Sequence, residues 1–513
     1  MLLKILNILF VSIIIALSLA ILANSMTKPL GRDEQMYCTA GYLLAQGKMI
    51  YRDFSYPAQL PYHPLLYAAL FKMLNTTHYL LVGRIVSTLC DILIVVCIVA
   101  IYRHIFKSFA VSAVLLPLAA AVLYVFNPIV DYANGYAWNH DVVILCVMLS
   151  LWLFISTDFN RNSKYWRIAA IGALLTLATC MRITTAIVQL LFFAVLLARP
   201  ADSLKQRIKT ISPFLIAAAI VFLWPVYLIA QAPRAFFLNL VKIPTLYGQW
   251  LHKISLVHNK FNLIFTCLTM PGYLALIILT IYLYLTIVCL RRRLKISNAV
   301  NLLLTALLPL IFFIIALIPP TMWIQYLAMP VPFLLIGAAF PLLYLRKLTA
   351  KSVLNKHFKI AAALLTICVL VAVASYPRVL HRTAAVLVPE RWEPIQVHKV
   401  AEDIAEKTKE PKLILTLAPL FAIEGGCDIY TELSAGSIVY RIADSLPPAD
   451  RAATHTVGPK TLPALLEKSP PSSVILGIER GKLAPLEAPL QAVVNPEWQT
   501  KTYPTGPILY FKR

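Results

Sequence analysis

Three carboxylates stand close together in a short stretch that follows the first apolar segment of the chain. The stretch from Pro29 to Pro64, PLGRDEQMYCTAGYLLAQGKMIYRDFSYPAQLPYHP, contains Asp33, Glu34 and Asp53. A carboxylate can act as a general base, which takes the proton from an attacking hydroxyl or amine. Such chemistry needs a defined surrounding, so the rest of the sequence must supply the elements that hold this stretch in place.

The composition predicts a polytopic membrane protein. Hydrophobic residues make up 60% of the 513 residues and charged residues only 13%, and apolar runs near twenty residues recur along the chain. The formal net charge is +23, but from residue 379 onward 15 basic residues balance 15 acidic ones. The other 31 basic and eight acidic residues lie within 1–378. Basic loops between apolar runs follow the positive-inside rule, and they argue against nucleic-acid binding.

About eleven transmembrane helices are expected. The stretch 166–199 is too long for one ordinary span, and basic loops flank both of its ends. If these loops are cytoplasmic, the chain crosses an even number of times between them, so we predict two short helices that meet near TCMRITT. The other spans are predicted at 5–25, 79–102, 109–126, 139–157, 210–230, 262–290, 299–319, 322–345 and 359–377.

This charge pattern places the N-terminus in the cytoplasm and the C-terminal portion outside. The connections 26–78, 127–138 and 231–261 then lie on the outer side. The apolar run Tyr62–Asn75 has 14 residues, which is too short for a span and predicts a helix lying in the membrane interface.

From about residue 379 the composition becomes that of an ordinary soluble domain. The segment 394–409 has helical periodicity and 461–468 predicts a second helix. Short strands are predicted in KLILTLAP, SVILGI and PILYFKR. We therefore expect a transmembrane domain over 1–378 and a small extracytoplasmic α/β domain over 379–513.

Five of the eight carboxylates in residues 1–378 map to the predicted outer face. Besides Asp33, Glu34 and Asp53 they include Asp131 in the second outer connection and Asp141 at the start of the next span. Acids contribute little to topology, so the positive-inside rule does not require this clustering. It indicates a site with Asp33 and Glu34 as candidate catalytic residues and with Asp53 and Asp141 as supporting acids. Simple solvation of these acids remains the alternative.

Two arginines on the same face are candidates for binding the phosphate of a donor. Arg182 lies where the two short helices meet, and Arg84 lies near the outer end of the second span. The planar guanidinium matches phosphate oxygens, although snorkelling also explains Arg84. A carboxylate beside a phosphate site fits group transfer from a lipid phosphate to a hydroxyl or amine. If the group is a sugar that is attacked directly, its anomeric centre inverts.

The first outer stretch resembles that of GT-C type membrane glycosyltransferases, which include the protein O-mannosyltransferases and the lipid A aminoarabinose transferases. The resemblance rests on the acid pair after the first span, on the turn GKMIYRDF and on the run HPLLY. Further similarities are VGRIVSTL, the acid Asp141, MRITTA and QYLAMPVPFLL, so the resemblance covers residues 1–378.

The resemblance implies a polyprenyl-phosphate sugar donor in the outer leaflet and a glycan, lipid or protein acceptor. Asp33 would be the leading base, with Glu34 its neighbour or substitute, and Arg182 would lie near the lipid phosphate. By analogy, the protein is expected in a bacterial inner (plasma) membrane.

The resemblance also bears on cofactors. No organic cofactor is expected, but some relatives bind a divalent metal such as Mg or Mn through an acid and a histidine. The candidate metal ligands here are His63, His140, His252 and His258.

A membrane transporter or lipid flippase is the alternative function. Transporters place polar groups near the bilayer midplane and often have repeated halves. Asp91 lies halfway through a predicted span and keeps this alternative open, because intramembrane acids are rarely without a role. No internal repeat is visible in the sequence. A scaffold or sensor would leave the acids of the first outer stretch unexplained.

Overall fold

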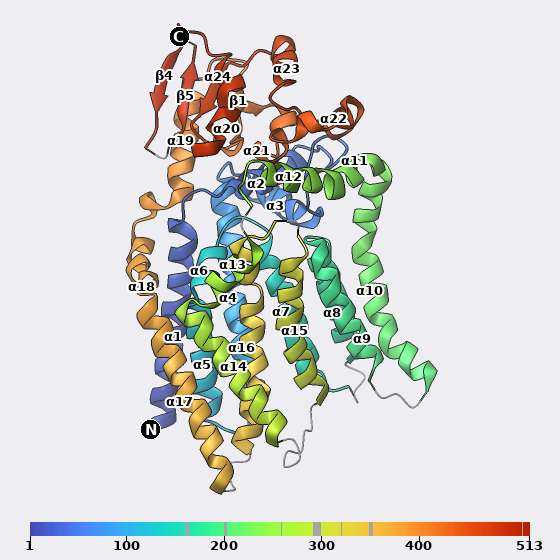
Figure 1. Ribbon diagram of the computed structural model, residues 1–513, viewed down its shortest axis with the longest axis vertical. Helices are drawn as coiled ribbons and strands as arrows, with labels where there is room; N and C mark the ends of the chain where they lie inside the picture. The colour runs from blue at the N-terminus through green and yellow to red at the C-terminus, as the bar shows by residue number, and fades with distance from the viewer. Residues whose placement is uncertain are drawn as a thin grey trace.

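Helices form the lower part of the protein, and a small sheet lies at its upper end (Figure 1). The structure is a computed structural model that describes residues 1–159, 164–199, 203–257, 259–290, 299–319, 321–347, 352–504 and 506–512. The candidate ligand His258 and the basic run 291–295 lie outside the described residues. The N-terminus lies at the lower end of the molecule and the C-terminus at the opposite end (Figure 1).

Within the described part of the chain, seven helices are long and apolar enough to cross a membrane. This confirms the prediction of a polytopic α-helical membrane protein, while the number of eleven spans stays a prediction. Three shorter apolar segments accompany these helices: α5 (Ser112–Val125), α7 (His140–Ser156) and the segment Ile183–Leu197. The seven helices are α1 (Leu2–Thr27), α4 (Tyr79–Ile105), α10 (Leu204–Gln231), α14 (Pro271–Leu290), α15 (Ala299–Leu317), α16 (Pro330–Lys347) with the turn before it, and α17 (Ser352–Ser375).

The predicted pair of short helices within 166–199 is confirmed. Helix α8 (Lys164–Thr179) and helix α9 (Ala186–Leu197) are joined at TCMRITT by a 3-10 turn, η1 (Ile183–Thr185). Helix α8 packs against both α7 and α10. Arg182 therefore stands at the apex of a helical hairpin.

Two of the predicted spans are interrupted. The span predicted over 262–290 is two helices, α13 (Lys260–Leu268) and α14, because Pro271 lacks the N–H needed to continue a helix from the preceding turn. The span predicted over 322–345 begins with a 3-10 turn, η4 (Ile324–Leu327), and becomes α-helical only at Pro330. In both places, proline starts the second segment, where its fixed φ is tolerated.

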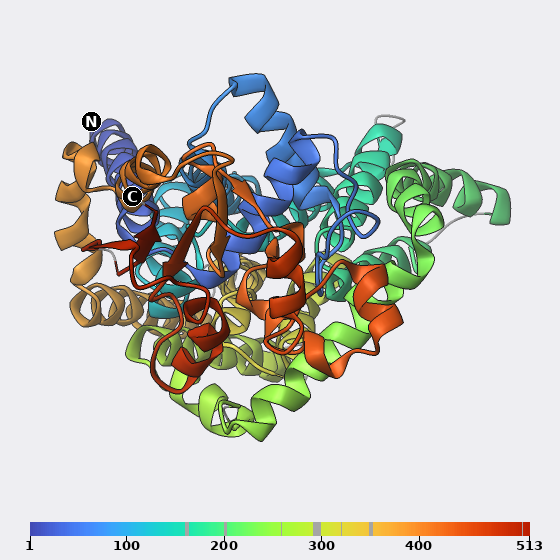
Figure 2. The same ribbon diagram turned by 90° about the horizontal axis from the view of Figure 1, so that it is seen from above.

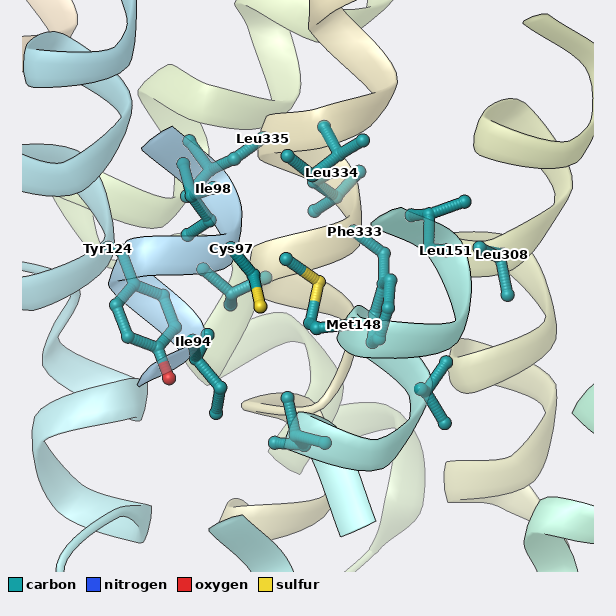
Figure 3. Close-up of a cluster of buried hydrophobic side chains, with 14 of the residues drawn as sticks. Ile94, Cys97, Ile98, Tyr124, Met148, Leu151, Leu308, Phe333, Leu334 and Leu335 are labelled. Atoms are coloured by element: carbon teal, nitrogen blue, oxygen red, sulfur yellow. The ribbon is translucent and has the colours of Figure 1, made fainter. Parts of the chain in front are cut away.

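The centre of the bundle is a packed apolar core. Ile98 of α4, Leu151 of α7 and Phe333 of α16 are 0–1% exposed and lie in one cluster (Figure 3). Phe333 also stacks on Phe312 of α15 with ring centroids 4.6 Å apart. Lipid tails are as apolar as these side chains, so close packing rather than water exclusion is the main force between the helices.

A layer of shorter helices lies between the bundle and the sheet. Sequence analysis expected a helix over Tyr62–Asn75, which is confirmed as α3 (Tyr62–Leu74), but it missed α2 (Arg32–Ala45). The sequence signal that could have predicted the start of α2 was Glu34, which follows Gly31 by three residues, the spacing of a capping box. The layer also contains α6 (Pro128–Ala133), α11 (Pro233–Phe237), the π-helical turn η2 (Leu238–Lys242) and α12 (Ile243–Lys253).

The C-terminal part contains a five-stranded mixed sheet in the order β2-β1-β3-β5-β4. Strand β1 pairs in parallel with β2 and β3, while β5 pairs antiparallel with β3 and β4. The predicted strands in KLILTLAP, SVILGI and PILYFKR are confirmed. The strands are β1 (Leu413–Thr416), β2 (Asp428–Ile429), β3 (Ser473–Leu476), β4 (Gln499–Thr502) and β5 (Ile508–Phe511).

Helices and 3-10 turns surround this sheet. These elements are α18 (Arg378–Thr383), η6 (Ala384–Leu387), η7 (Pro389–Arg391), α19 (Glu393–Lys407), α20 (Leu420–Ile423), η8 (Thr431–Leu433), α21 (Ser437–Tyr440), η9 (Ala443–Ser445), α22 (Pro448–Thr454), α23 (Leu462–Lys468), η10 (Gly481–Glu487) and α24 (Ala488–Gln491). The helices predicted over 394–409 and 461–468 are confirmed as α19 and α23.

The C-terminal part shares its core with the outer helices. One apolar cluster joins Met36 and Phe71 of α2 and α3 to Ile404, Phe421 and Ile475 around the sheet. Seen from above, the C-terminal segments cover much of the bundle (Figure 2). The sheet is therefore packed against α2 and α3, and α2 carries the candidate residues Asp33 and Glu34.

Truncating a buried side chain of α4 should destabilise the bundle more than truncating a lipid-facing one. Ile98→Ala leaves a cavity in the core and should cost about 2–4 kcal/mol, whereas Leu93, which is 46% exposed, borders lipid that can fill the space. Thermal unfolding in detergent measures the difference. Equal losses for Ile98→Ala and the control Leu93→Ala would contradict this description of the core.

Candidate functional site

A cavity of about 290 Å³ lies where the N-terminus of α2 meets the sheet domain. Its walls come from α2, α6, α12, α21 and the segments before α7 and η4. Aromatic rings dominate the walls, and the charged groups are one carboxylate and two guanidinium groups. The lining residues are Gly31, Arg32, Asp33, Tyr132, Tyr136, Trp138, Tyr247, Trp323, Gln325, Ile438 and Arg441.

Asp33 is the carboxylate of this cavity. Its side chain makes no hydrogen bond or salt bridge to another described residue. Burial raises the pKa of Asp33 above its usual 3.8, the Arg441 charge opposes this, Glu34 adds to it, and Arg32 and Arg182 lower it. An unpaired carboxylate with a raised pKa is well suited to accept a proton.

Glu34, the next residue, does not line the cavity, and both of its carboxylate oxygens accept hydrogen bonds. It is fully buried, and Arg84 donates to it twice, from Nε to Oε1 at 2.9 Å and from Nη2 to Oε2 at 2.8 Å. The backbone N–H groups of Ala137 and Gly31 donate to Oε1 and Oε2, each at 2.7 Å. This geometry gives Glu34 a structural position rather than access to a substrate.

Arg84 is fully buried in the same network. Its remaining N–H groups donate to the carbonyls of Ser25, Lys28 and Pro29 at the end of α1, at 2.7–3.2 Å. Its guanidinium lies 5.6 Å from the ring centroid of Tyr136, which lines the cavity. The structure therefore does not bring Arg84 to a phosphate site, and instead makes it the support of the cavity wall.

Arg182 is half-buried beside the cavity. Its Nη1 lies 3.3 Å from the sulfur of Met329, and its guanidinium lies 4.8 Å from the ring centroid of Tyr326. Tyr326 follows the cavity residue Gln325. No carboxylate forms a salt bridge with Arg182 among the described residues. Its positive charge is thus left for an anion.

Asp53 lies away from this cavity. Its two oxygens accept hydrogen bonds from Arg52, both at 2.8 Å, and from the backbone N–H of Met49 at 2.7 Å. These bonds close a turn before α3. Pairing with Arg52 lowers the pKa of Asp53, so this acid stabilises the turn.

Asp141 lies beneath the wall of the cavity. Its Oδ2 accepts the N–H of Gly135 at 2.8 Å, while its Oδ1 has no partner among the described residues. Gly135 has φ +86°, and a Cβ there would lie 3.0 Å from Ser25, so only glycine fits. Asp141 therefore fixes the segment that carries Tyr136 and Trp138.

Asp91 and Asp131 are both engaged in internal contacts. Asp91 accepts from the hydroxyl of Tyr124 at 2.5 Å and from Nδ2 of Asn134 at 2.7 Å. Asp131 forms a salt bridge with Arg382 and accepts from the hydroxyl of Tyr376 at 2.8 Å. These acids tie the connection 127–138 to α4 and to the segment after α17.

The histidine candidates do not converge on a metal site. His63 is fully buried, and burial lowers its pKa to about 3. Its ring packs against Tyr37 with centroids 5.0 Å apart. His140 is also buried and its ring nitrogens have no hydrogen-bond partner among the described residues, while His252 is exposed on α12.

Metal binding also needs a group of ligands. In the part of the chain that the structure describes, no three His, Cys, Asp or Glu side chains are arranged to hold a metal ion. The described candidates thus do not fit a preformed metal site.

Sequence analysis missed the contribution of the sheet domain to the site. Arg441, next to α21, donates from Nη2 to Glu479 at 2.6 Å and from Nη1 to the hydroxyl of Tyr247 at 2.8 Å. Glu479 also lies 3.6 Å from Arg32. No spacing in the sequence links Arg441 to Asp33, which is about 400 residues earlier, so no signal could have found it.

The bundle and the layer of shorter helices above it have an ArnT-like fold, which confirms the fold that the resemblance implied. Residues 59–228 match the family model described as dolichyl-phosphate-mannose-protein mannosyltransferase. No curated protein matches the chain by sequence.

Several solved structures share the fold. ArnT from Cupriavidus metallidurans, bound to undecaprenyl phosphate, aligns with a TM-score of 0.60 and 12% identity over 98% of this chain and 97% of that one. The oligosaccharyltransferase of Archaeoglobus fulgidus, tethered with an acceptor peptide, aligns with a TM-score of 0.51 and 12% identity over 98% of this chain and 74% of that one.

The same Archaeoglobus fulgidus enzyme in complex with Zn and sulfate aligns with a TM-score of 0.51 and 13% identity over 98% of this chain and 73% of that one. At these identities the likeness shows the fold.

Removing Arg84 should destabilise the protein strongly. Arg84→Met leaves the Glu34 carboxylate buried without its partner, which should cost about 3–5 kcal/mol. The matched control is Arg52→Met, since the Arg52–Asp53 pair is largely exposed and should contribute less than about 1 kcal/mol. Thermal unfolding of both variants in detergent measures the difference. A melting temperature of Arg84→Met equal to that of the control would refute the supporting role of this pair.

Proposed function

We propose that the chain is an inverting glycosyltransferase that moves a sugar from a polyprenyl-phosphate donor to an acceptor hydroxyl or amine at the outer face of the membrane. The observation that carries this proposal is Asp33, an unpaired carboxylate in an aromatic-lined cavity with Arg32, Arg182 and Arg441 around it. A base beside excess positive charge suits the transfer of a group away from a phosphate.

The reaction follows from this arrangement. Asp33 takes the proton of the acceptor hydroxyl or amine while that oxygen or nitrogen attacks the anomeric carbon from the side opposite the phosphate. The new bond forms as the bond from the anomeric carbon to the phosphate oxygen breaks, so polyprenyl phosphate leaves and the configuration inverts. Arg182 is the group proposed to offset the charge that develops on this phosphate.

Two further facts support a lipid-linked donor. The family model that matches residues 59–228 is named for a dolichyl-phosphate sugar, and the ArnT structure contains undecaprenyl phosphate. The aromatic rings of Tyr132, Trp138 and Trp323 offer flat apolar faces for a sugar ring. The acceptor class, a glycan, lipid or protein, is not specified by these facts.

The proposal includes the placement of the protein in its membrane. Residues 1–378 form the catalytic membrane domain, and residues 379–513 form the domain outside the cytoplasm. The positions of the N-terminus and the sheet at opposite ends of the molecule support a cytoplasmic N-terminus and a periplasmic or extracellular C-terminal domain (Figure 1). The membrane is proposed to be the inner (plasma) membrane of a bacterium.

A divalent metal such as Mg or Mn has no step in this proposal, because the described candidate histidines do not gather with acids.

The alternative of a transporter or flippase has lost its main support. It rested on Asp91, whose carboxylate is held by Tyr124 and Asn134.

Replacing the proposed base should abolish most of the transfer. Asp33→Asn keeps the shape of the side chain but cannot take the proton, so the rate should fall by about 10²–10⁴ while donor binding persists. The assay is transfer of labelled sugar from a polyprenyl-phosphate donor by protein reconstituted in liposomes. Asp428→Asn, on exposed β2, is the control and should transfer like the wild type.

Two outcomes would count against the proposal. Full transfer by folded Asp33→Asn would remove Asp33 as the base. If the wild type transferred no sugar from any donor but moved lipid between leaflets, the flippase alternative would hold instead.

The transfer rate should also fall in acid. Since only ionised Asp33 can act as a base, and burial holds its pKa above 3.8, kcat/KM should decline as the pH falls through a value above 3.8. Arg441→Gln removes the charge that most lowers this pKa, so the decline should move to higher pH. The pH profiles of both proteins measure this shift. An unchanged profile in a variant with normal melting temperature would mean that Arg441 does not act on the base.

A further inference from the structure

A second cavity, of about 230 Å³, adjoins the Asp33 cavity and belongs largely to the sheet domain. The two cavities share Gly31 and Arg32, so they meet at the N-terminus of α2. From the sheet domain come Leu417, directly after β1, and Gly477 and Ile478, directly after β3. The cavity therefore lies at the carboxyl ends of two neighbouring parallel strands.

This position is the topological switch point of the sheet. The chain leaves β1 toward β2 on one side of the sheet and leaves β3 toward β4 and β5 on the other side, so the connections diverge at the carboxyl ends of β1 and β3. In open α/β sheets, ligands bind in the crevice at such a point, outside the carboxyl ends of the strands. Here the cavity at this position is also lined by Arg32 and Gln35 of α2, the helix that carries the proposed base.

The charges in the cavity favour an anion. Arg32 and Arg480 line it, against the single lining carboxylate of Glu393, whose Oε1 accepts the N–H of Leu30 at 2.9 Å. Arg480 forms no salt bridge with another described residue, and Arg32 contacts Glu479 only at 3.6 Å. Both guanidinium groups therefore line the cavity with N–H donors that can still bind an anion.

The backbone at this edge is already engaged. The N–H groups of Gly477, Ile478 and Glu479 donate to the carboxylate of Glu487 at 2.7–2.9 Å. A nest of N–H groups at this position would otherwise hold a phosphate. Any anion in the cavity must therefore be bound by the arginine side chains, which suit phosphate or carboxylate groups.

We propose that this cavity is the acceptor site, and that it binds a saccharide carrying a phosphate or carboxylate between Arg32 and Arg480. The saccharide would extend past Gly31 into the neighbouring cavity, where its accepting hydroxyl or amine meets Asp33. This inference rests on the proposed function for the word acceptor, but the binding site itself does not depend on transfer. The saccharide is either free or the headgroup of a glycolipid.

Binding of a sugar phosphate to the full-length protein in nanodiscs tests this site. The probes are glucose 1-phosphate, neutral glucose, and phosphatidylglucose incorporated into the nanodisc. The wild type should bind a phosphorylated probe at least about tenfold more tightly than glucose, because each arginine contributes charge-assisted hydrogen bonds. Arg480→Gln should weaken that binding about tenfold, and Arg480→Lys should weaken it less. Lys482→Gln, two residues away and outside the cavity lining, is the control and should bind like the wild type.

The outcomes separate the site from the proposed function. Arginine-dependent binding of soluble glucose 1-phosphate supports a free acceptor, and such binding of phosphatidylglucose alone supports a glycolipid. Equal binding of glucose and both phosphorylated probes, or wild-type binding by folded Arg480→Gln, would overturn the site. If the site binds as expected but the wild type transfers no sugar, the proposed function fails and the anionic saccharide site stands. If transfer occurs with an acceptor KM that Arg480→Gln leaves unchanged, the function stands and this site is not the acceptor site.

Discussion

The buried ion pair between Glu34 and Arg84 determines how the candidate site is assembled. Two charges taken out of water destabilise a protein unless their hydrogen bonds are complete. Here they are complete, since Glu34 accepts four N–H groups and Arg84 reaches three carbonyls at the end of α1. The pair thereby joins α1, α2, α4 and the connection before α7. Because adjacent residues on a helix point about 100° apart, locking Glu34 inward turns Asp33 toward the cavity.

The two neighbouring acids Asp33 and Glu34 are therefore distinguished by their surroundings and not by their residue type. In the sequence, Asp33 and Glu34 are adjacent carboxylates, and only the family resemblance favoured Asp33 as the base. The residues that separate them, Arg84 and Ala137, lie 50 and 103 positions from Glu34. Periodicity and spacing reveal only near neighbours along the chain, so they indicated a site around these acids but gave no physical reason to separate the proposed base from the residue that supports it.

The same limit explains which parts of the fold were predictable. Most membrane helices were predictable, because a helix that spans a bilayer needs a long apolar run, which a sliding window along the sequence detects. The paired helices α8 and α9 followed from the charges of their loops. Helix α2 was missed because it is short, mixed in polarity and capped by Gly31, and Arg441 was missed because only folding brings the sheet domain to α2.

The apolar core that the sheet shares with α2 and α3 gives a reason why the C-terminal part contacts α2. A transferase must hold a donor that comes from the membrane and an acceptor that comes from outside, with their reacting atoms about 3 Å apart. If the C-terminal part moved freely, Arg441 would not keep its place beside Asp33, and the two cavities would not meet at Gly31. Packing Phe421 and Ile475 into one cluster with Met36 and Phe71 removes that freedom. The apolar contact thus fixes the geometry on which the charged groups of the site depend.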